Sequence, residues 1–246
     1  MNDDKRSASL AGAGRLSGGD YTRVSISGAG KVSGDIKAEA LRISGAGKVE
    51  GRTEAMQIAV SGSGVFGGEV VAEEMRVSGA ARIDGMARVK ELKCSGSYRV
   101  KESIAAEYVK VSGVLRVGGD LEADLFKASG GFEIDGLLSA DKIEIRPGGR
   151  CYAREIGGAK IDVRRGGHRE RGILLDGLVR MFSGKGIAEL GATTIEGDEI
   201  HLEDTVADVV RGKRVEIGPG CRIKVVEYSE DLTVHSSAEV DKQQKV

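Results

Sequence analysis

The chain has 246 residues, among them 38 glycines but only two prolines and no tryptophan, and its 37 basic and 38 acidic residues leave a net charge of −1. That balance gives no general attraction to nucleic acid, which is therefore not expected as a partner. The first residues lack the apolar core of a signal peptide, and no apolar run approaches the roughly 18 residues of a membrane-spanning helix. We expect a cytoplasmic protein.

Residues 1–20 are only weakly patterned. They contain GAGRLSGGDY, a looser copy of a motif that recurs downstream. We predict an N-terminal tail and partial cap over 1–20, followed by a regular domain over 21–164.

The regular domain repeats one short unit. VSISGAGKVSG at 24–34 returns as LRISGAGKVEG at 41–51, and a Ser-Gly pair recurs at the same step without insertion. A fixed period of this size, about 17 residues, is typical of a solenoid, in which each repeat buries its apolar face by stacking on its neighbours. The glycines of the pairs mark corners of the coil, where we expect positive φ angles: Gly28, Gly45, Gly62, Gly79, Gly96, Gly113 and Gly130.

Positions one repeat apart form columns that alternate between apolar and polar. Apolar columns start at Val24, Ile26, Val32, Ile36 and Ala38, with polar columns between them. Alternation with period two indicates short strands with one face inward, and a repeat of about 17 residues holds three such strands with their turns. The sequence therefore predicts an all-β fold, a three-sided parallel β-helix with about 17 residues per rung.

One column changes from small to large residues along the chain. It runs from Gly30, Gly47, Gly64 and Ala81 to three large residues, Tyr98, Leu115 and Phe132. The period-two rule favours an inward direction, which would widen the rod toward its C-terminal end. An outward direction would make Tyr98, Leu115 and Phe132 an exposed stripe for lateral contact.

Regularity ends near Val163, and a basic loop and short amphipathic helix are expected over 165–192. Leu174, Leu178 and Phe182 recur at helical spacing, so the helix is predicted over about 173–183. We favour packing of this helix on the side or end of the rod, where it would close the core between its two parts. Its basic flank, with Arg180 and Lys185, makes an anionic membrane surface the alternative partner, which we do not predict.

Further rungs are expected over 193–228, with a shorter step of about 15 residues. Ile200 and Leu202 recur there as Val215 and Ile217. The last stretch, over 229–246, is predicted to be a polar tail with at most one more strand.

No constellation of catalytic, cofactor-binding or metal-binding residues is recognised. GAGKVSG resembles a phosphate-binding loop, but valine follows its lysine where Ser or Thr would be required. His168, His201 and His235 are scattered, and none has a nucleophile at a recognised spacing. The cysteines are far apart, and Cys94 and Cys151 fall in apolar columns, which favours buried, reduced thiols. We expect no enzyme activity.

The short repeated coils, the GAGKVSGDI-like corners and the glycines that follow them resemble the bactofilins, bacterial cytoskeletal proteins that form polymers. The following glycines are Gly34, Gly51, Gly68 and Gly85. The similarity covers about residues 21–163 and, less regularly, 193–228. It implies a right-handed parallel β-helix that assembles end to end without nucleotide and serves as a scaffold for cell shape, envelope or motility machinery.

End-to-end assembly also has a physical rationale, because the first and last rungs of a β-helix expose unpaired backbone groups over an apolar core. The expected polymer-end residues are Val24 and Ile26 at one end and Ile223 and Val225 at the other. The expected partner is a second copy of the chain, with a related paralogue or envelope-associated proteins as further candidates.

Two other classes of function stay open. A binding module is the first alternative, since repetitive β-helices also occur in adhesins, although these would carry an export signal. A hexapeptide-type acyltransferase, suggested by VEIGPGCRI, is less favoured because its left-handed coil needs an apolar residue every six positions.

Overall fold

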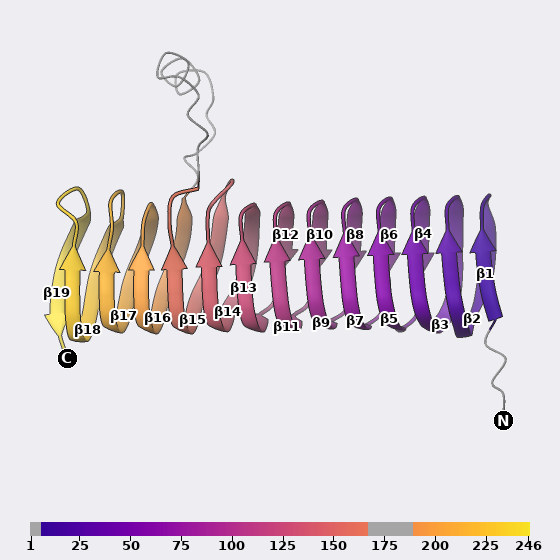
Figure 1. Cartoon of the computed structure of the whole chain (residues 1–246), viewed down its shortest axis with the longest axis horizontal. Coiled ribbons are helices and arrows are strands. Elements are labelled where there is room, and N and C mark those ends of the chain that lie inside the picture. The colour runs from indigo at the N-terminus through magenta and orange to yellow at the C-terminus, as the bar shows by residue number, and fades with distance from the viewer. Residues whose placement is uncertain (1–5, 167–188) are drawn as a thin grey trace, which may run out of the picture.

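The computed structural model describes residues 6–166 and 189–246 of the chain. These residues form a parallel β-solenoid of about 13 turns with about 17 residues per turn. In Figure 1 the strands nearest the viewer run upward while the chain advances from right to left and returns behind them, so the coil is right-handed. The all-β fold is confirmed, and a right-handed coil does not fit the acyltransferase alternative. The helix predicted over 173–183 lies outside the described residues.

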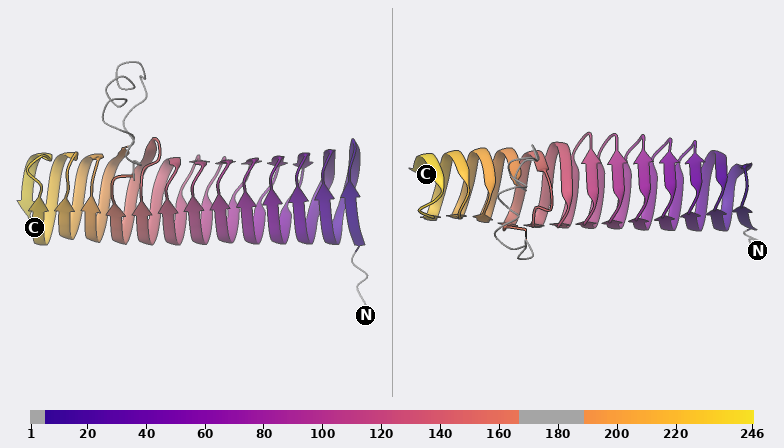
Figure 2. Two further views of the ribbon diagram at one scale, coloured as in Figure 1. Left: turned by 45° about the horizontal axis from the view of Figure 1, so that its top comes forward. Right: turned by 90° about the horizontal axis from the view of Figure 1, so that it is seen from above.

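The strands follow one another along a straight rod, as the further views in Figure 2 show. They are β1 (Arg6–Leu10), β2 (Gly14–Ile26), β3 (Ala29–Ile43), β4 (Ala46–Val49), β5 (Thr53–Val60), β6 (Ser63–Phe66), β7 (Val70–Val77), β8 (Ala80–Ile83), β9 (Ala87–Cys94), β10 (Ser97–Val100), β11 (Ile104–Val111), β12 (Val114–Val117), β13 (Leu121–Ala128), β14 (Gly131–Ile145), β15 (Cys151–Val163), β16 (Leu190–Leu202), β17 (Thr205–Ile217), β18 (Arg222–Val234) and β19 (Glu239–Lys245).

Strands β5 and β6, within residues 53–66, show how the sequence of one turn makes three sides. Buried and outward residues alternate along β5 and β6, except at Met56 and Gln57, two consecutive exposed residues at which the strand bends. We call residues 53–56 and their equivalents in other turns the first side, 57–60 the second and 63–66 the third. Each side buries two residues: Thr53 and Ala55, Ile58 and Val60, Gly64 and Phe66.

The core is a continuous column of apolar side chains along the axis of the rod. Pairing joins residues one repeat apart through most of the chain, for example Leu41 to Ile58 and Ile58 to Met75. All three are essentially inaccessible to solvent. Each methylene buried in this way stabilises the fold by about 0.8 kcal/mol, but only when a neighbouring turn covers it. The apolar columns seen in the sequence are therefore the core.

The corner glycines are required for a reason other than the one expected. Among the described residues, positive φ angles occur at Gly19, Gly34, Gly220 and Asp204, and at none of the Ser-Gly corners. At the corners the backbone of consecutive turns approaches so closely that a Cβ would overlap the carbonyl group below it. A Cβ on Gly62, for example, would lie 2.6 Å from the carbonyl carbon of Ser44. The expectation of left-handed geometry was wrong, and close stacking explains these glycines.

The solenoid extends further toward both termini than expected. At the N-terminal end β1 pairs with β2, and Ala8 and Leu10 lie beside Val24 and Ile26. At the C-terminal end β18 continues to Val234, and β19 adds a further strand beside it. The described part of the predicted N-terminal tail, residues 6–20, and the predicted C-terminal tail over 229–246 therefore contribute turns of the rod.

Strands β15 and β16 stack directly on each other, although residues 167–188 lie between them in the sequence. Ile161 pairs with Ile200 and Val163 with Leu202, a step more than twice as long as the regular one. The core is therefore continuous between the two parts through the described strands alone. The next step, from Ile200 to Val215, is shorter than the regular one, as predicted.

Candidate functional site

The N-terminal end of the rod exposes an incompletely covered core. β1 pairs with β2 and with no other described strand, so its outer edge has no partner there. The inward residues Ala8, Leu10 and Leu16 pack against the core but are only partly buried. This end therefore presents apolar side chains and free backbone groups together.

The C-terminal end has the same character. β19 pairs with β18 and with no other described strand. The partly buried residues that pack against the core at this end are Tyr228, Leu232, Val234, Ala238 and Val240. Apart from Ala106, which lies midway along the rod, all partly buried apolar residues in contact with the described core are at one end or the other.

The two ends of the described solenoid lie in the same column. Arg6 pairs with Tyr21, and Tyr21 with Ala38, in the column of Ala55 on the first side. At the other end Tyr228 pairs with Lys245, and Gly212 with Tyr228, in the continuation of that column. The rod thus holds close to a whole number of turns. A second copy placed on either end would find all three sides in register.

The charges at the two ends are opposite. Residues 6–20, which form the first described turn, carry two basic residues, Arg6 and Arg15, and one acidic residue, Asp20, which leaves a net charge of +1. Residues 229–246 carry four acidic and two basic side chains, among them Asp231 and Glu239. Opposite charges on two facing surfaces favour contact between unlike ends over contact between like ends.

The polymer-end residues expected from the sequence lie inside the rod instead. Val24 and Ile26 are fully buried beneath β1. Ile223 is covered by Val240 of β19, and Val225 pairs with Lys242. The prediction is wrong by one turn at each end, because β1 and β19 continue the rod where tails are predicted.

The true end residues were hidden by changes in the repeat length. The steps from Leu10 to Ile26 and from Leu16 to Val32 are one residue shorter than the regular step. At the other end the regular step returns between Ile217 and Val234, but the shorter step before it obscured the pattern. A search that allowed the step to vary by one or two residues would have found both ends.

The candidate lateral stripe of Tyr98, Leu115 and Phe132 points into the core. Each of the three is at most 1% exposed. Phe132 packs edge-on against Phe126, with ring centroids 5.3 Å apart, and the hydroxyl of Tyr98 donates to the sulfur of Met75. The outward alternative is wrong, and the inward direction favoured by the period-two rule is confirmed.

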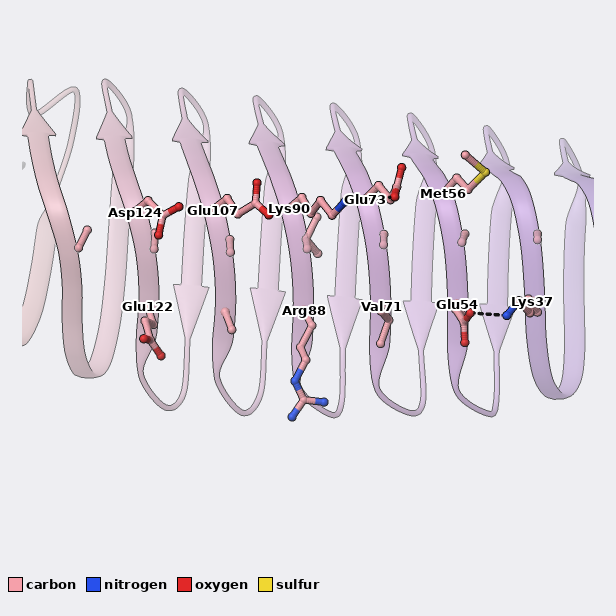
Figure 3. Close-up of a pocket in the computed structure, with 18 of the residues that line it drawn as sticks. Lys37, Glu54, Met56, Val71, Glu73, Arg88, Lys90, Glu107, Glu122 and Asp124 are labelled. Carbon is pink, nitrogen blue, oxygen red and sulfur yellow. Dashed lines mark hydrogen bonds and ion pairs between the residues drawn. The ribbon is translucent and has the colours of Figure 1, made fainter.

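A groove with a volume of about 920 Å³ runs along the first side of the rod. Its floor is a column of small residues, Ala38, Ala55, Ala72, Ala106, Ala123 and Ala140, interrupted by Val89. Outward side chains rise on either side of this floor, as Figure 3 shows. We call this surface the acidic face.

Carboxylates dominate the acidic face. One row is Glu39, Met56, Glu73, Lys90, Glu107, Asp124 and Asp141, with five acids and one lysine. Near the N-terminal end the charges are balanced, because Lys37 lies 2.6 Å from Glu54 and lowers the pKa of that carboxyl group by hydrogen bonding. Toward the C-terminal end, Glu107, Glu122, Asp124 and Asp141 have no cation within ion-pair distance in the described part of the chain.

The third side has the opposite charge. Its outward row runs through Arg15, Lys31, Lys48, Val65, Arg82, Arg99 and Arg116 and continues to Glu133, and the parallel row holds small residues such as Ala29, Ala46 and Ser63. We call this surface the basic face. A second groove, of about 610 Å³, lies at its N-terminal end and is lined by Arg15, Lys31 and Lys48 without a carboxylate. A nearly neutral chain thus separates its charges onto different sides.

No catalytic arrangement is found among residues 6–166 and 189–246. No group of three or more His, Cys, Asp or Glu side chains there is arranged to hold a metal ion. His201 lies between Glu203 and Glu216 on the strands, and His235 contacts Ser237. His168 lies outside the described residues. Nor does any described helix have the length and apolar character to cross a bilayer.

Cys94 and Cys151 are buried, as predicted, and Cys221 is buried as well. Cys94, Cys151 and Cys221 have no disulfide partner among the described residues. Burial raises the pKa of each thiol to about 11. A thiol with so high a pKa holds little thiolate at neutral pH, so none of the three is suited to act as a nucleophile.

Comparison with known proteins finds uncharacterized relatives and no matching family model. The chain is 42% identical over 98 residues to the uncharacterized protein YhbE of Bacillus subtilis (strain 168), which covers 40% of this chain and 38% of that protein. It is 44% identical over 77 residues to the uncharacterized protein YhbF of the same strain, which covers 31% and 27%. The chain thus spans well under half of either relative. No family model matches, and no solved structure matches.

Proposed function

We propose that this protein is a non-enzymatic structural protein that stacks end to end, without nucleotide, into a bacterial cytoskeletal scaffold. The observation that carries the proposal is the incomplete burial of inward apolar residues at both ends, Leu10 and Leu16 at one and Val234 and Val240 at the other. Stacking would bury these side chains at about 25 cal/mol per Å² and would pair the free edges of β1 and β19.

The geometry of the ends favours stacking in one direction. Because the first and last strands end in the same column, a copy added head to tail continues the parallel coil with each side in register. The basic first turn would then face the acidic last turn, whereas head-to-head stacking would place Arg6 and Arg15 opposite themselves. Assembly of this kind needs no bound nucleotide, which suits a static scaffold.

The proposal is tested with variants that place charge on one end. Leu10→Asp with Leu16→Asp alters the N-terminal end, and Val234→Asp with Val240→Asp alters the C-terminal end. Leu137→Asp is the matched control, because Leu137 is 38% exposed on the side of the rod. We expect long filaments by electron microscopy for the unmodified protein and the control, and folded short species for both end variants.

Two results would overturn the proposal. The first is a monomer by light scattering at high concentration, which would favour a binding module. The second is filaments of unchanged length from both end variants, with circular dichroism spectra equal to that of the unmodified protein. Mixing the two end variants gives a further check, since head-to-tail stacking allows them to form dimers through their intact ends.

A further inference from the structure

The acidic and basic faces share one geometry because the same repeating turn generates both. Each face carries one side chain per turn in each row, and turns of a β-solenoid are about 4.8 Å apart. A row of carboxylates on one rod therefore has the same spacing as a row of ammonium and guanidinium groups on another. Displacement of two rods by any whole number of turns keeps the rows matched.

Many surface charges elsewhere on the rod are paired internally. Arg214 bridges Glu199 and Glu230 on neighbouring turns at 2.5 and 2.6 Å, and Lys160 lies 3.0 Å from the same Glu199. These interactions hold the pKa of Glu199 below its usual value. On the acidic face, the four carboxylates Glu107, Glu122, Asp124 and Asp141 lie close together over three consecutive turns, and none of them forms such a pair among the described residues.

Unsatisfied charge is also present on the basic face. Lys48 and Arg99 are exposed and have no carboxylate within ion-pair distance in the described part of the chain. The small residues beside them, such as Ala46 and Ser97, leave the long basic side chains standing above the surface. The alanine floor of the acidic face is a groove into which such side chains can reach.

We propose that the acidic face of one copy binds the basic face of a second copy, so that the rods associate side by side. The basic side chains of one rod lie along the alanine-floored groove of the other, and their charges are met by Glu107, Glu122, Asp124 and Asp141. Because the two faces are different surfaces of one chain, each rod keeps a free face after pairing. Association therefore continues beyond a dimer.

Side-by-side contact is independent of end stacking, and the two can be measured apart. Lateral association widens an assembly, whereas end stacking lengthens it. Sedimentation velocity measures the size of the assembly, and small-angle X-ray scattering measures its cross-sectional radius. Both are carried out on the unmodified full chain and on the N-terminal end variant that combines Leu10→Asp with Leu16→Asp.

Charge reversal on one face at a time provides the test. Glu107→Lys with Asp124→Lys alters the acidic face, and Lys48→Glu with Arg99→Glu alters the basic face. The control is Glu102→Lys with Asp135→Lys, which changes net charge as much as the acidic-face variant at exposed residues outside both faces. We expect each single-face variant to weaken lateral association by about tenfold or more, and the control to leave it nearly unchanged.

Combining both reversals in one chain restores opposite charges across the contact, so lateral association should return. It should also weaken when ionic strength rises from about 0.1 M to about 1 M, as the screening length falls from about 10 Å to about 3 Å. Rods that stay one molecule wide at low salt would overturn the proposal, as would single-face variants that associate as well as the control. Filaments of normal length that are only one molecule wide would overturn the lateral contact but would support end stacking.

Discussion

The carbonyl oxygen of Gly79 occupies the place where a side chain on Gly96 would begin. That oxygen accepts a hydrogen bond from the amide of Ser97 at 2.9 Å, so it cannot move away without loss of the bond. A Cβ on Gly96 would also lie 2.7 Å from the carbonyl carbon of Ser78. The stacking distance of the turns, set by hydrogen bonding, thus excludes every residue but glycine at this corner.

Gly96→Ala should therefore destabilise the protein severely, by about 3 kcal/mol or more, through backbone overlap. Gly12→Ala is the control, because a Cβ there meets no atom within 4 Å and φ is not positive. Chemical denaturation followed by circular dichroism measures both. Equal stability of the two variants would show that the corner can relax.

Thr53→Val should stabilise the protein. The Thr53 hydroxyl is buried without a hydrogen-bond partner, in a column where its neighbours are Ile36 and Val70. Removing an unpaired buried hydroxyl saves about 1 kcal/mol of desolvation. Thr205→Val is the matched control and should destabilise the protein, because the equally buried Thr205 hydroxyl donates to the carbonyl of Glu203 at 2.9 Å and this hydrogen bond would be lost. Urea midpoints that move in the same direction would contradict this prediction.

The three thiols should react slowly in the native state and at once in denaturant. Burial protects Cys94, Cys151 and Cys221 and raises the pKa of each from 9.0 to about 11. Titration with a thiol reagent, with and without guanidinium, measures the difference. Three thiols that react rapidly without denaturant would mean that the core opens locally.

The same pKa values predict how stability depends on pH. Between about pH 9 and pH 11 the unfolded chain loses thiol protons that the folded chain keeps. The unfolded state is therefore favoured as pH rises through this window, and the stabilising effect is complete only below it. Cys94→Ala should reduce the slope of the denaturation midpoint against pH, whereas an identical slope would exclude this thiol as a cause.

Removal of residues 167–188 should leave the fold intact. β15 and β16 stack directly, and deletion would join Gly166 to Glu189, leaving four residues between Val163 and Leu190. The equivalent connection one turn earlier, 146–150, has five residues. Circular dichroism and the melting temperature of the deletion variant should therefore match those of the full chain within a few degrees. Loss of the β spectrum would show that the segment is needed for folding.

The sequence by itself determined the repeat, the parallel β-solenoid and the identity of the core. Inward direction is a local property, because side chains of a strand alternate with period two, and stacking repeats this alternation in every turn. For that reason the pattern alone places Tyr98, Phe132, Cys94 and Cys151 in the core, where the structure has them.

The tertiary structure alone decided the corners, the ends and the charged faces. The glycine at position 96 is required by a distance between turns, which no local propensity contains. The ends moved outward to Leu10 and Val234 because the step between turns varies, and hydrogen bonding fixes which residues pair. The acidic and basic faces exist because the strand bends at Met56 and Gln57, and that bend assigns each column to a side. The corners, the ends and the charged faces depend on contacts between residues far apart in the sequence. Alternation along one strand therefore does not specify these three features.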